Sequence, residues 1–289
     1  MKRFTLAFLA FLLVATVPVL AFKDDLEIPI GETARGASLS PDEKTIYVGA
    51  LLDRTILAID TKSGDVVCEA KLTEINASAY AKAVFANEKG EVFAPGSDVL
   101  EVFLLDRDLF HMDTFDISGF GITDCEGVVA DKDGNIYAAD RSGNGGIYKI
   151  KISKGEPELD EKWGNTGWAD IGPVRLPYLK GNSIYAVDTG SSTLYKIDVA
   201  SGKVTKLASL ASGGFATAAD DAGRIYVAHY NDGSVAVSIW ENGKVTELTR
   251  SELGITSNIG GIAVNKDGSK LFLVEEKTNI GGVLRSYKK

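Results

Sequence analysis

One pattern of hydrophobic and polar positions recurs six times along the chain. Each copy is an apolar stretch, a polar turn that usually contains glycine, and a strand ending in apolar and aromatic residues. The first strand residues after the six turns are Ile46, Val92, Ile136, Ile184, Ile225 and Leu271. The gaps between them are 46, 44, 48, 41 and 46 residues. A period of about 40–50 residues built from short strands predicts the blades of a β-propeller.

The pattern predicts an all-β fold, a six-bladed β-propeller of four-stranded antiparallel blades. In the third copy we expect strands over residues 127–130, 135–140 and 146–152, and a fourth strand that starts near Pro157. Asp133-Gly134 lies in the first turn of this copy and suits a tight hairpin, because glycine adopts a positive φ without strain. We number the strands of each blade a to d, outward from the propeller axis.

The last copy lacks a fourth strand, because the chain ends at Lys289 soon after its third one. At the other end of the chain, residues 25–30 belong to no repeat. We therefore predict that this N-terminal segment forms the outer strand of blade six and closes the ring, which protects the sheet edges.

The N-terminus has the composition of a secretory signal peptide. Lys2 and Arg3 precede an apolar run, and small residues end at Ala21, where we expect cleavage. A retained membrane anchor is the weaker alternative, because Pro18 interrupts a stretch that barely reaches spanning length. The sequence thus predicts a signal peptide over 1–21, one propeller domain over 22–289, and a secreted or periplasmic monomer with no membrane attachment after cleavage.

Charge and cysteine content narrow the candidate chemistry. The net charge is −9 and no basic cluster is present, so nucleic acid is not an expected partner. Cys68 and Cys125 are the two cysteines. The repeat register places the first in an outermost strand of blade one and the second in an innermost strand of blade three. That separation exceeds the reach of a disulfide, so we expect both to be reduced.

The short a–b turns suggest a structural face, and the variable d–a and b–c loops mark the opposite face as the functional one. Aligning the blades places six residues where strand a begins near the axis: Arg35, Lys82, Glu126, Val174, Phe215 and Gly260. Nearby positions hold Asp124, Arg175 and Asn258, and the ends of strand b hold Asp140-Arg141, Asp188, His229-Tyr230 and Glu275-Glu276. We interpret Arg35, Lys82, Arg141, Arg175, Trp168 and Tyr230 as candidate ligand-binding residues.

Glu126 is the sharpest catalytic or metal-binding candidate. Hard cations such as calcium prefer several oxygen ligands, which Glu126, Asp140, Asp188 and Asn258 would supply from separate blades. The alternative is a carboxylate neutralised by Arg35 or Lys82, and the sequence leaves both interpretations open.

His229 and Trp168 carry similar pairs of interpretations. His229 would be a general base or metal ligand, or else a partly buried hydrogen-bonding residue. Trp163 and Trp168 lie in a glycine-rich stretch that either forms a lid over a ligand or packs an outer strand. His111 falls in an outer strand and is expected to be structural.

Two blade segments carry a family resemblance, EGVVAD with NIYAAD (126–131 and 135–140) and SIYAVDTG (183–190). They resemble six-bladed propellers of the gluconolactonase, senescence-marker and luciferin-regenerating group, and neighbours of the strictosidine-synthase-like and NHL type. The resemblance implies a divalent cation on the axis, held by an acidic residue before glycine at one strand entrance and by Asn-Gly and Asp-Gly at two others. Glu126-Gly127 matches the first, whereas Arg35-Gly36 and Lys82-Ala83 stand at neighbouring entrances.

Two hypotheses follow from the sequence. The first is an exported gluconolactonase-like propeller that binds a small, possibly anionic, molecule or a protein on its central loop face. The alternative is a divalent-metal-dependent lactone or ester hydrolase that uses Glu126 and His229, with calcium as the expected ion. No phosphate-cradling loop, zinc spacing or nucleophile elbow supports other chemistries.

Overall fold

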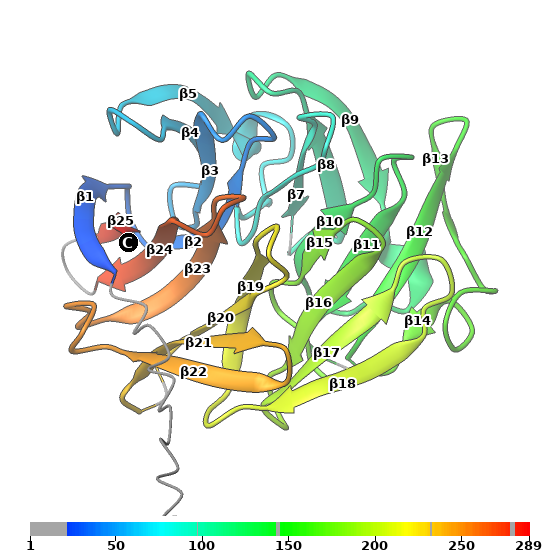
Figure 1. Ribbon diagram of the computed structural model, residues 1–289. Coiled ribbons are helices and arrows are strands. Elements are labelled where there is room, and N and C mark those ends of the chain that lie inside the picture. The colour runs from blue at the N-terminus through cyan, green and yellow to red at the C-terminus, as the bar shows by residue number, and fades with distance from the viewer. Residues whose placement is uncertain (1–21, 97, 143–144, 232, 278–280) are drawn as a thin grey trace, which may run out of the picture.

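The computed structural model describes residues 22–289, apart from 97, 143–144, 232 and 278–280. Six antiparallel sheets are arranged around a central axis, as the sequence predicts; five have four strands, and the third has a short fifth strand beside its four (Figure 1). The expected signal peptide lies outside the described residues. Within them no helix is long and apolar enough to cross a membrane.

The strands follow the predicted order in every blade. Blade one holds β2 (Ala34–Leu39), β3 (Thr45–Ala50), β4 (Thr55–Asp60) and β5 (Val66–Lys71). Blade two holds β6 (Phe85–Ala86), β7 (Val92–Gly96), β8 (Glu101–Leu105) and β9 (His111–Asp116). Blade three holds β10 (Cys125–Ala130), β11 (Ile136–Asp140), β12 (Ile147–Ser153) and β13 (Glu156–Leu159), with β14 (Trp168–Ala169) paired to β12.

The other three blades repeat the arrangement. Blade four holds β15 (Tyr178–Lys180), β16 (Ser183–Asp188), β17 (Thr193–Asp198) and β18 (Val204–Ser209). Blade five holds β19 (Gly214–Ala219), β20 (Ile225–His229), β21 (Val235–Glu241) and β22 (Lys244–Thr249). Blade six holds β23 (Asn258–Val264), β24 (Lys270–Lys277), β25 (Gly281–Lys288) and β1 (Lys23–Pro29). Two single-turn 3₁₀ helices, Leu72–Glu74 and Ser118–Phe120, lie in loops.

In blades three and five an aspartate side chain holds the a–b turn that it begins. In blade three the Asp131 carboxylate accepts the backbone N–H groups of residues 133 and 135, at 2.9 and 3.0 Å. Gly134 follows with φ of 86°, which a side chain would strain. Tyr137 donates its hydroxyl to the same carboxylate, and blade five repeats the device with Asp220 and Tyr226. The turn and the adjacent strand are thereby tied together.

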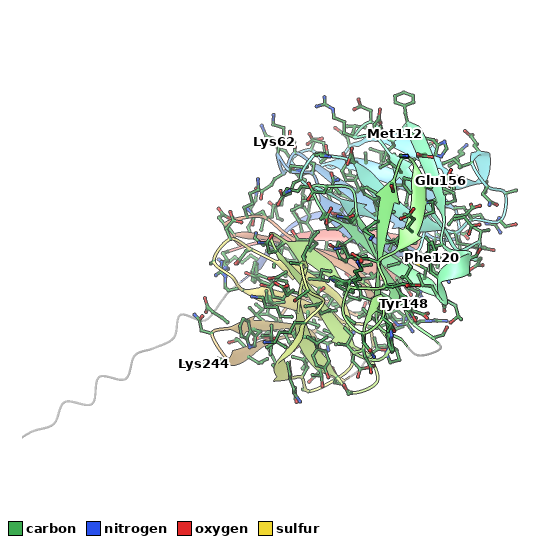
Figure 2. All side chains as sticks on the ribbon, turned by 90° about the vertical axis from the view of Figure 1, so that its right-hand side faces the viewer. Lys62, Met112, Phe120, Tyr148, Glu156 and Lys244 are labelled. Carbon is green, nitrogen blue, oxygen red and sulfur yellow. The ribbon has the colours of Figure 1, made fainter. Side chains whose placement is uncertain are left out.

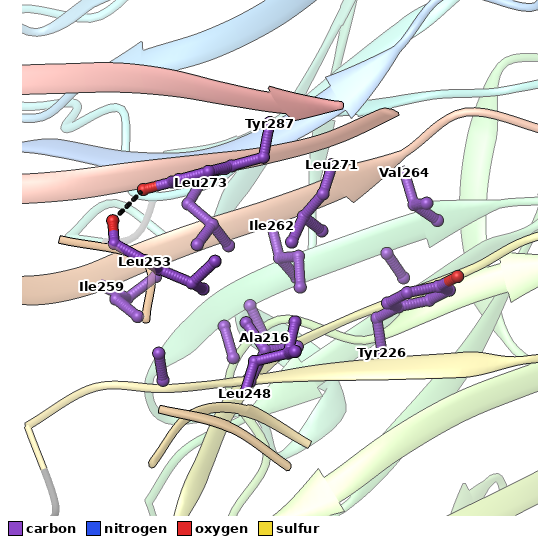
Figure 3. Close-up of a cluster of buried hydrophobic side chains, with 14 of the residues drawn as sticks. Ala216, Tyr226, Leu248, Leu253, Ile259, Ile262, Val264, Leu271, Leu273 and Tyr287 are labelled. Carbon is purple, nitrogen blue, oxygen red and sulfur yellow. Dashed lines mark hydrogen bonds between the residues drawn. The ribbon is translucent and has the colours of Figure 1, made fainter. Parts of the chain in front are cut away.

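The hydrophobic core lies mainly between blades. Between blades five and six, Tyr226, Leu248, Ile262 and Leu273 belong to one buried cluster (Figure 3). Tyr287 closes this cluster and donates its hydroxyl to the carbonyl oxygen of Leu253 at 3.0 Å. Each blade buries both of its faces against neighbours, which explains the weak alternation along the inner strands.

The N-terminal strand closes the ring, as predicted. Strand β1 pairs antiparallel with β25, from Lys23 opposite Lys288 to Pro29 opposite Val283. Ion pairs reinforce the seam, and Arg285 Nη2 lies 2.8 Å from Glu27 Oε2. The two cysteines are free, Cys125 being buried and Cys68 half-buried, as expected for residues at opposite edges of different blades.

Deleting residues 22–32 is expected to lower the melting temperature by about 10 °C or more, because blade six loses its outer strand and β25 becomes an exposed edge. Calorimetry on chains starting at residues 22 and 33 measures this. An unchanged melting temperature would contradict a stabilising role for the seam.

Candidate functional site

A β-bulge recurs at the start of the innermost strand in four of the six blades. In four innermost strands, two residues face one partner across the ladder. The pairs are Arg35–Gly36 opposite Gly49, Glu126–Gly127 opposite Ala139, Phe215–Ala216 opposite Ala228, and Gly260–Gly261 opposite Val274. A bulge bends the strand and redirects a side chain. The first residue of each pair therefore stands at the strand entrance near the axis.

Glycine follows Glu126 because the neighbouring blade comes very close. A Cβ atom on Gly127 would lie 2.1 Å from the carbonyl oxygen of Arg175. Gly36 has φ of +64°, and a Cβ there would lie 2.8 Å from the Cα of Ala83. The blades can approach the axis this closely only where the second bulge residue is small.

Glu126 lies at the centre of three guanidinium groups. Its side chain is 2% exposed, and its carboxylate accepts a hydrogen bond from Arg175 Nη1. Arg141 Nη1 lies 3.2 Å and Arg35 Nη1 lies 3.7 Å from Glu126 Oε1. Of the two cations considered as neutralising partners of Glu126, Arg35 therefore lies beside it, whereas Lys82 pairs with Asp98 and Asp124.

A second carboxylate and two aromatic rings flank Arg35. Arg35 Nε donates to Glu276 Oε1 at 2.5 Å, and the Tyr230 hydroxyl donates to Glu276 Oε2 at 2.6 Å. The rings of Phe215 and Tyr230 stack with centroids 4.9 Å apart, and Arg35 and Arg175 both lie over the Phe215 ring, at 5.6 and 5.0 Å. The cations therefore contact both carboxylates and π faces.

Burial would lower the pKa of Arg35, but attraction by Glu276 and Glu126 outweighs it and raises that pKa. For Tyr230, burial and then the Glu276 carboxylate raise the pKa above its usual value. Both groups therefore keep their protons throughout the physiological range, with Arg35 charged and Tyr230 a neutral hydrogen-bond donor.

Lys82, Asp124 and Arg141 extend the network toward the loops. Arg141 Nη2 lies 2.6 Å and Lys82 Nζ lies 3.7 Å from the Asp124 carboxylate. Lys82 also pairs with Asp98, which is half-exposed. We define the mouth cluster as the residues joined in this way: Arg35, Lys82, Asp98, Asp124, Glu126, Arg141, Arg175, Phe215, Tyr230 and Glu276. Its four cations balance its four carboxylates.

The alignment of blade four was wrong by one residue. Val174 forms a β-bridge with Asp188, as Cys125 pairs with Asp140 in blade three. The position equivalent to Glu126 is therefore Arg175, and Val174 is buried in the core. The long loop before Pro173 weakened the repeat pattern that served for alignment.

His229 lies away from the mouth cluster, within blade five. It is fully buried, with Nδ1 2.9 Å from Ser212 Oγ and Nε2 2.8 Å from Ser238 Oγ. Both ring nitrogens thus meet serine hydroxyls, so the geometry fits the hydrogen-bonding interpretation and presents no nitrogen to the axis.

The four residues expected to hold a cation do not converge. Asp140 accepts the backbone N–H of Asp124 at 3.0 Å and so holds the loop before its own blade's inner strand. Asp188 accepts the backbone N–H of Gly190 at 2.8 Å, and the Asn258 side chain lies against Tyr230 of the mouth cluster, where it interacts with the Tyr230 hydroxyl. In the described part of the chain, no group of three or more His, Cys, Asp or Glu side chains could hold a metal ion. These donors do not fit an axial divalent cation, since Glu126 already faces three guanidinium groups and Glu276 is held by Arg35 and Tyr230.

The tryptophans and His111 lie at the periphery. Trp168 in β14 stacks on Tyr148 with centroids 5.9 Å apart, on the outer side of blade three where Tyr148 is labelled in Figure 2. Trp163 is buried and donates Nε1–H to the carbonyl oxygen of Val199. His111 lies in outer strand β9, 2.9 Å from Thr114 Oγ1. The structure does not bring Trp168 to the mouth cluster.

A cavity lies at the end of the axis opposite the mouth cluster. A cavity of about 570 Å³ is lined by the a–b turns and strand ends of all six blades. A narrow channel of about 20 Å³, lined by small and apolar residues of the innermost strands, lies between this cavity and the mouth cluster. The sequence identified these turns as structural and gave no signal for the cavity, because its walls come from six separated segments.

Fold and site together define a six-bladed propeller with a charge-balanced axial mouth. Among solved structures it is similar to a gluconolactonase from Xanthomonas campestris, at 12% identity and a TM-score of 0.66, over 91% of this chain and 88% of that one. It is also similar to a streptogramin B lyase, at 12% identity and 0.65, over 93% and 98% of the chains. A catalytically inactive virginiamycin B lyase from Staphylococcus aureus gives 14% identity and 0.63, over 92% and 99%. No protein-family model and no curated protein matches the sequence. At these identities the similarity confirms the fold.

Replacing Glu126 by glutamine is expected to destabilise the protein by about 3–5 kcal/mol, because three guanidinium groups lose the carboxylate between them. Urea unfolding should show a lower midpoint with an unchanged slope. The matched control is Asp133→Asn, an exposed partner of Lys132, which should leave the urea midpoint nearly unchanged because solvent screens the pair. Equal effects of the two substitutions would contradict the central position of Glu126.

Proposed function

We propose that the protein is a binding propeller that takes a small carboxylate-bearing molecule at its mouth cluster. The observation that carries this proposal is the convergence of three guanidinium groups on the Glu126 carboxylate. The planar guanidinium fork matches carboxylate oxygens in geometry as well as in charge. The Glu126 carboxylate thus shows, within the protein itself, how the three guanidinium groups surround a carboxylate.

Arg175 and Arg141 have capacity for a second carboxylate. Within the described residues, Nη1 is the one Arg175 atom that makes a hydrogen bond or ion pair. The Arg175 and Arg141 side chains are 24% and 39% exposed, so their outer faces reach solvent. A ligand carboxylate can therefore bind there without displacing Glu126.

The stacked Phe215 and Tyr230 rings indicate what the rest of the ligand is. They lie beside the arginines, and Phe215 is in contact with two of them. Phe215 is 5% exposed and is already covered by Tyr230 and the two guanidinium groups, so the half-buried Tyr230 ring is the one that a flat apolar group would pack against. The ligand class that fits both features is a small aromatic or unsaturated carboxylate.

The donor set favours binding over metal-dependent hydrolysis. A cation at the axis would face Arg35, Arg141 and Arg175, whose charges would repel it. Asp140, Asp188 and His229 are each engaged within their own loops or blades. The activities named for the gluconolactonase and lyase neighbours belong to those proteins. If the N-terminal segment is a signal peptide as the sequence predicts, binding takes place outside the cytoplasm.

Titration calorimetry with benzoate and its neutral isostere benzamide tests the proposal on residues 22–289. We expect benzoate to bind at least about tenfold more tightly, equivalent to about 1.4 kcal/mol. Arg175→Gln should remove most of that difference. Arg107→Gln, an exposed cation at a turn of blade two, should leave it unchanged. Equal binding of the two probes, or no effect of Arg175→Gln, would contradict the proposal.

A hydrolysis assay separates binding from catalysis. With glucono-δ-lactone, we expect no hydrolysis above the buffer rate in chelator or with added calcium, manganese or zinc. A saturable, metal-dependent rate that is lost in Glu126→Gln would overturn the binding assignment and establish the hydrolase alternative.

A further inference from the structure

The cavity at the a–b turn end of the axis has the size of a small-molecule site. Its volume of about 570 Å³ falls within the range of about 300–1,000 Å³ that is typical of ligand pockets. The adjoining channel of about 20 Å³ has room for little more than one water molecule. A ligand in this cavity is therefore physically separated from the mouth cluster.

Two aromatic residues stand where the cavity meets the narrow channel. Phe85 and Tyr178 line both spaces, and their rings meet edge to face with centroids 6.2 Å apart. Within the described residues, the Tyr178 hydroxyl makes no hydrogen bond. The cavity thus has an apolar floor and a hydroxyl available to a ligand.

The charges around the cavity are unequal. Five carboxylates and three lysines line it: Glu43, Glu88, Asp131, Asp133 and Asp221, and Lys132, Lys180 and Lys266. Two of the lysines pair with carboxylates of the cavity, and the third is bound to a backbone carbonyl that does not neutralise its charge. Lys132 pairs with Asp133 at 2.8 Å, Lys180 pairs with Asp221 at 2.5 Å, and Lys266 Nζ donates to the carbonyl oxygen of Pro41 at 2.6 Å.

The carboxylates are less fully neutralised. Glu43 accepts the backbone N–H of Lys266, which carries no charge. In the described part of the chain, Glu88 makes no hydrogen bond or close ion pair, although, after the larger effect of Asp133, its charge contributes to raising the pKa of Lys132. Burial first, and then the negative charges of Asp221 and Glu43, raise the pKa of Tyr178 to about 12. The electrostatic potential near Phe85 and Tyr178 is therefore negative, as five carboxylates against three lysines would produce.

We propose that this cavity is a second binding site, for an organic cation that combines an ammonium group with an apolar body. The body packs on Phe85 and Tyr178, where the aromatic faces also attract a cation. The ammonium group is directed to the Glu88 and Glu43 carboxylates, which form no close ion pair in the described part of the chain. A carboxylate ligand would be repelled here, so the two ends of the axis differ in ligand charge.

Three probes of matched shape test the assignment: 4-phenylbutylamine, 4-phenylbutanol and 4-phenylbutyrate. Titration calorimetry on residues 22–289 should show the amine binding about fivefold to tenfold more tightly than the alcohol. Amide chemical-shift changes from the amine should map to residues 39–43, 85–88, 130–133 and 178–182. Changes from the butyrate should map instead to the mouth cluster.

Two substitutions separate charge from shape. Glu88→Gln, at an exposed position, should weaken the amine about threefold and leave the alcohol unchanged. Tyr178→Phe should weaken both, because both lose the hydroxyl. Glu69→Gln on outer strand β5 is the matched control and should change neither. Equal affinities for amine and alcohol, amine shifts outside the named segments, or no binding at millimolar probe would each overturn the proposal.

Discussion

Antiparallel pairing of β1 with β25 is the constraint on which the rest of the structure depends. It joins the first strand of the chain to the last and makes six sheets into a closed ring. Closure defines the axis, and the axis gathers residues that are far apart in sequence. Arg35 and Glu276, which are 241 positions apart, form a hydrogen-bonded ion pair only because blades one and six are neighbours.

Closure also divides the axis into three parts with different physical properties. A charge-balanced mouth lies at one end, a narrow apolar channel in the middle, and a wide cavity with excess carboxylates at the other end. Buried ion pairs contribute little net stability, because desolvation offsets their attraction. The ion pairs of the mouth cluster instead fix the orientation of the arginine side chains, since each arginine is held by a carboxylate on another blade or loop.

The sequence predicts strands and turns well, but it predicts less well which side chains lie near the propeller axis. Turn spacing located the blades, because hairpins depend on neighbours in sequence. The unmatched residues 25–30 correctly indicated ring closure, because the last repeat lacked one strand. The guanidinium groups around Glu126 come from three different blades, so their convergence depends on blade tilt and side-chain reach. Loop length before Pro173 shifted the alignment onto Val174, and paired hydrogen bonds placed His229 inside a blade. These outcomes depend on contacts that no local pattern encodes.

The bulge at the strand entrances has an evolutionary consequence. Because two residues share one partner there, the first of them is released from the strict alternation of the ladder. The same position accepts arginine, glutamate, phenylalanine and glycine in different blades of one molecule. A substitution at this position changes the chemistry of the axis while the strand register stays intact. The fold therefore offers a set of interchangeable positions at which new specificities can arise without rebuilding the scaffold.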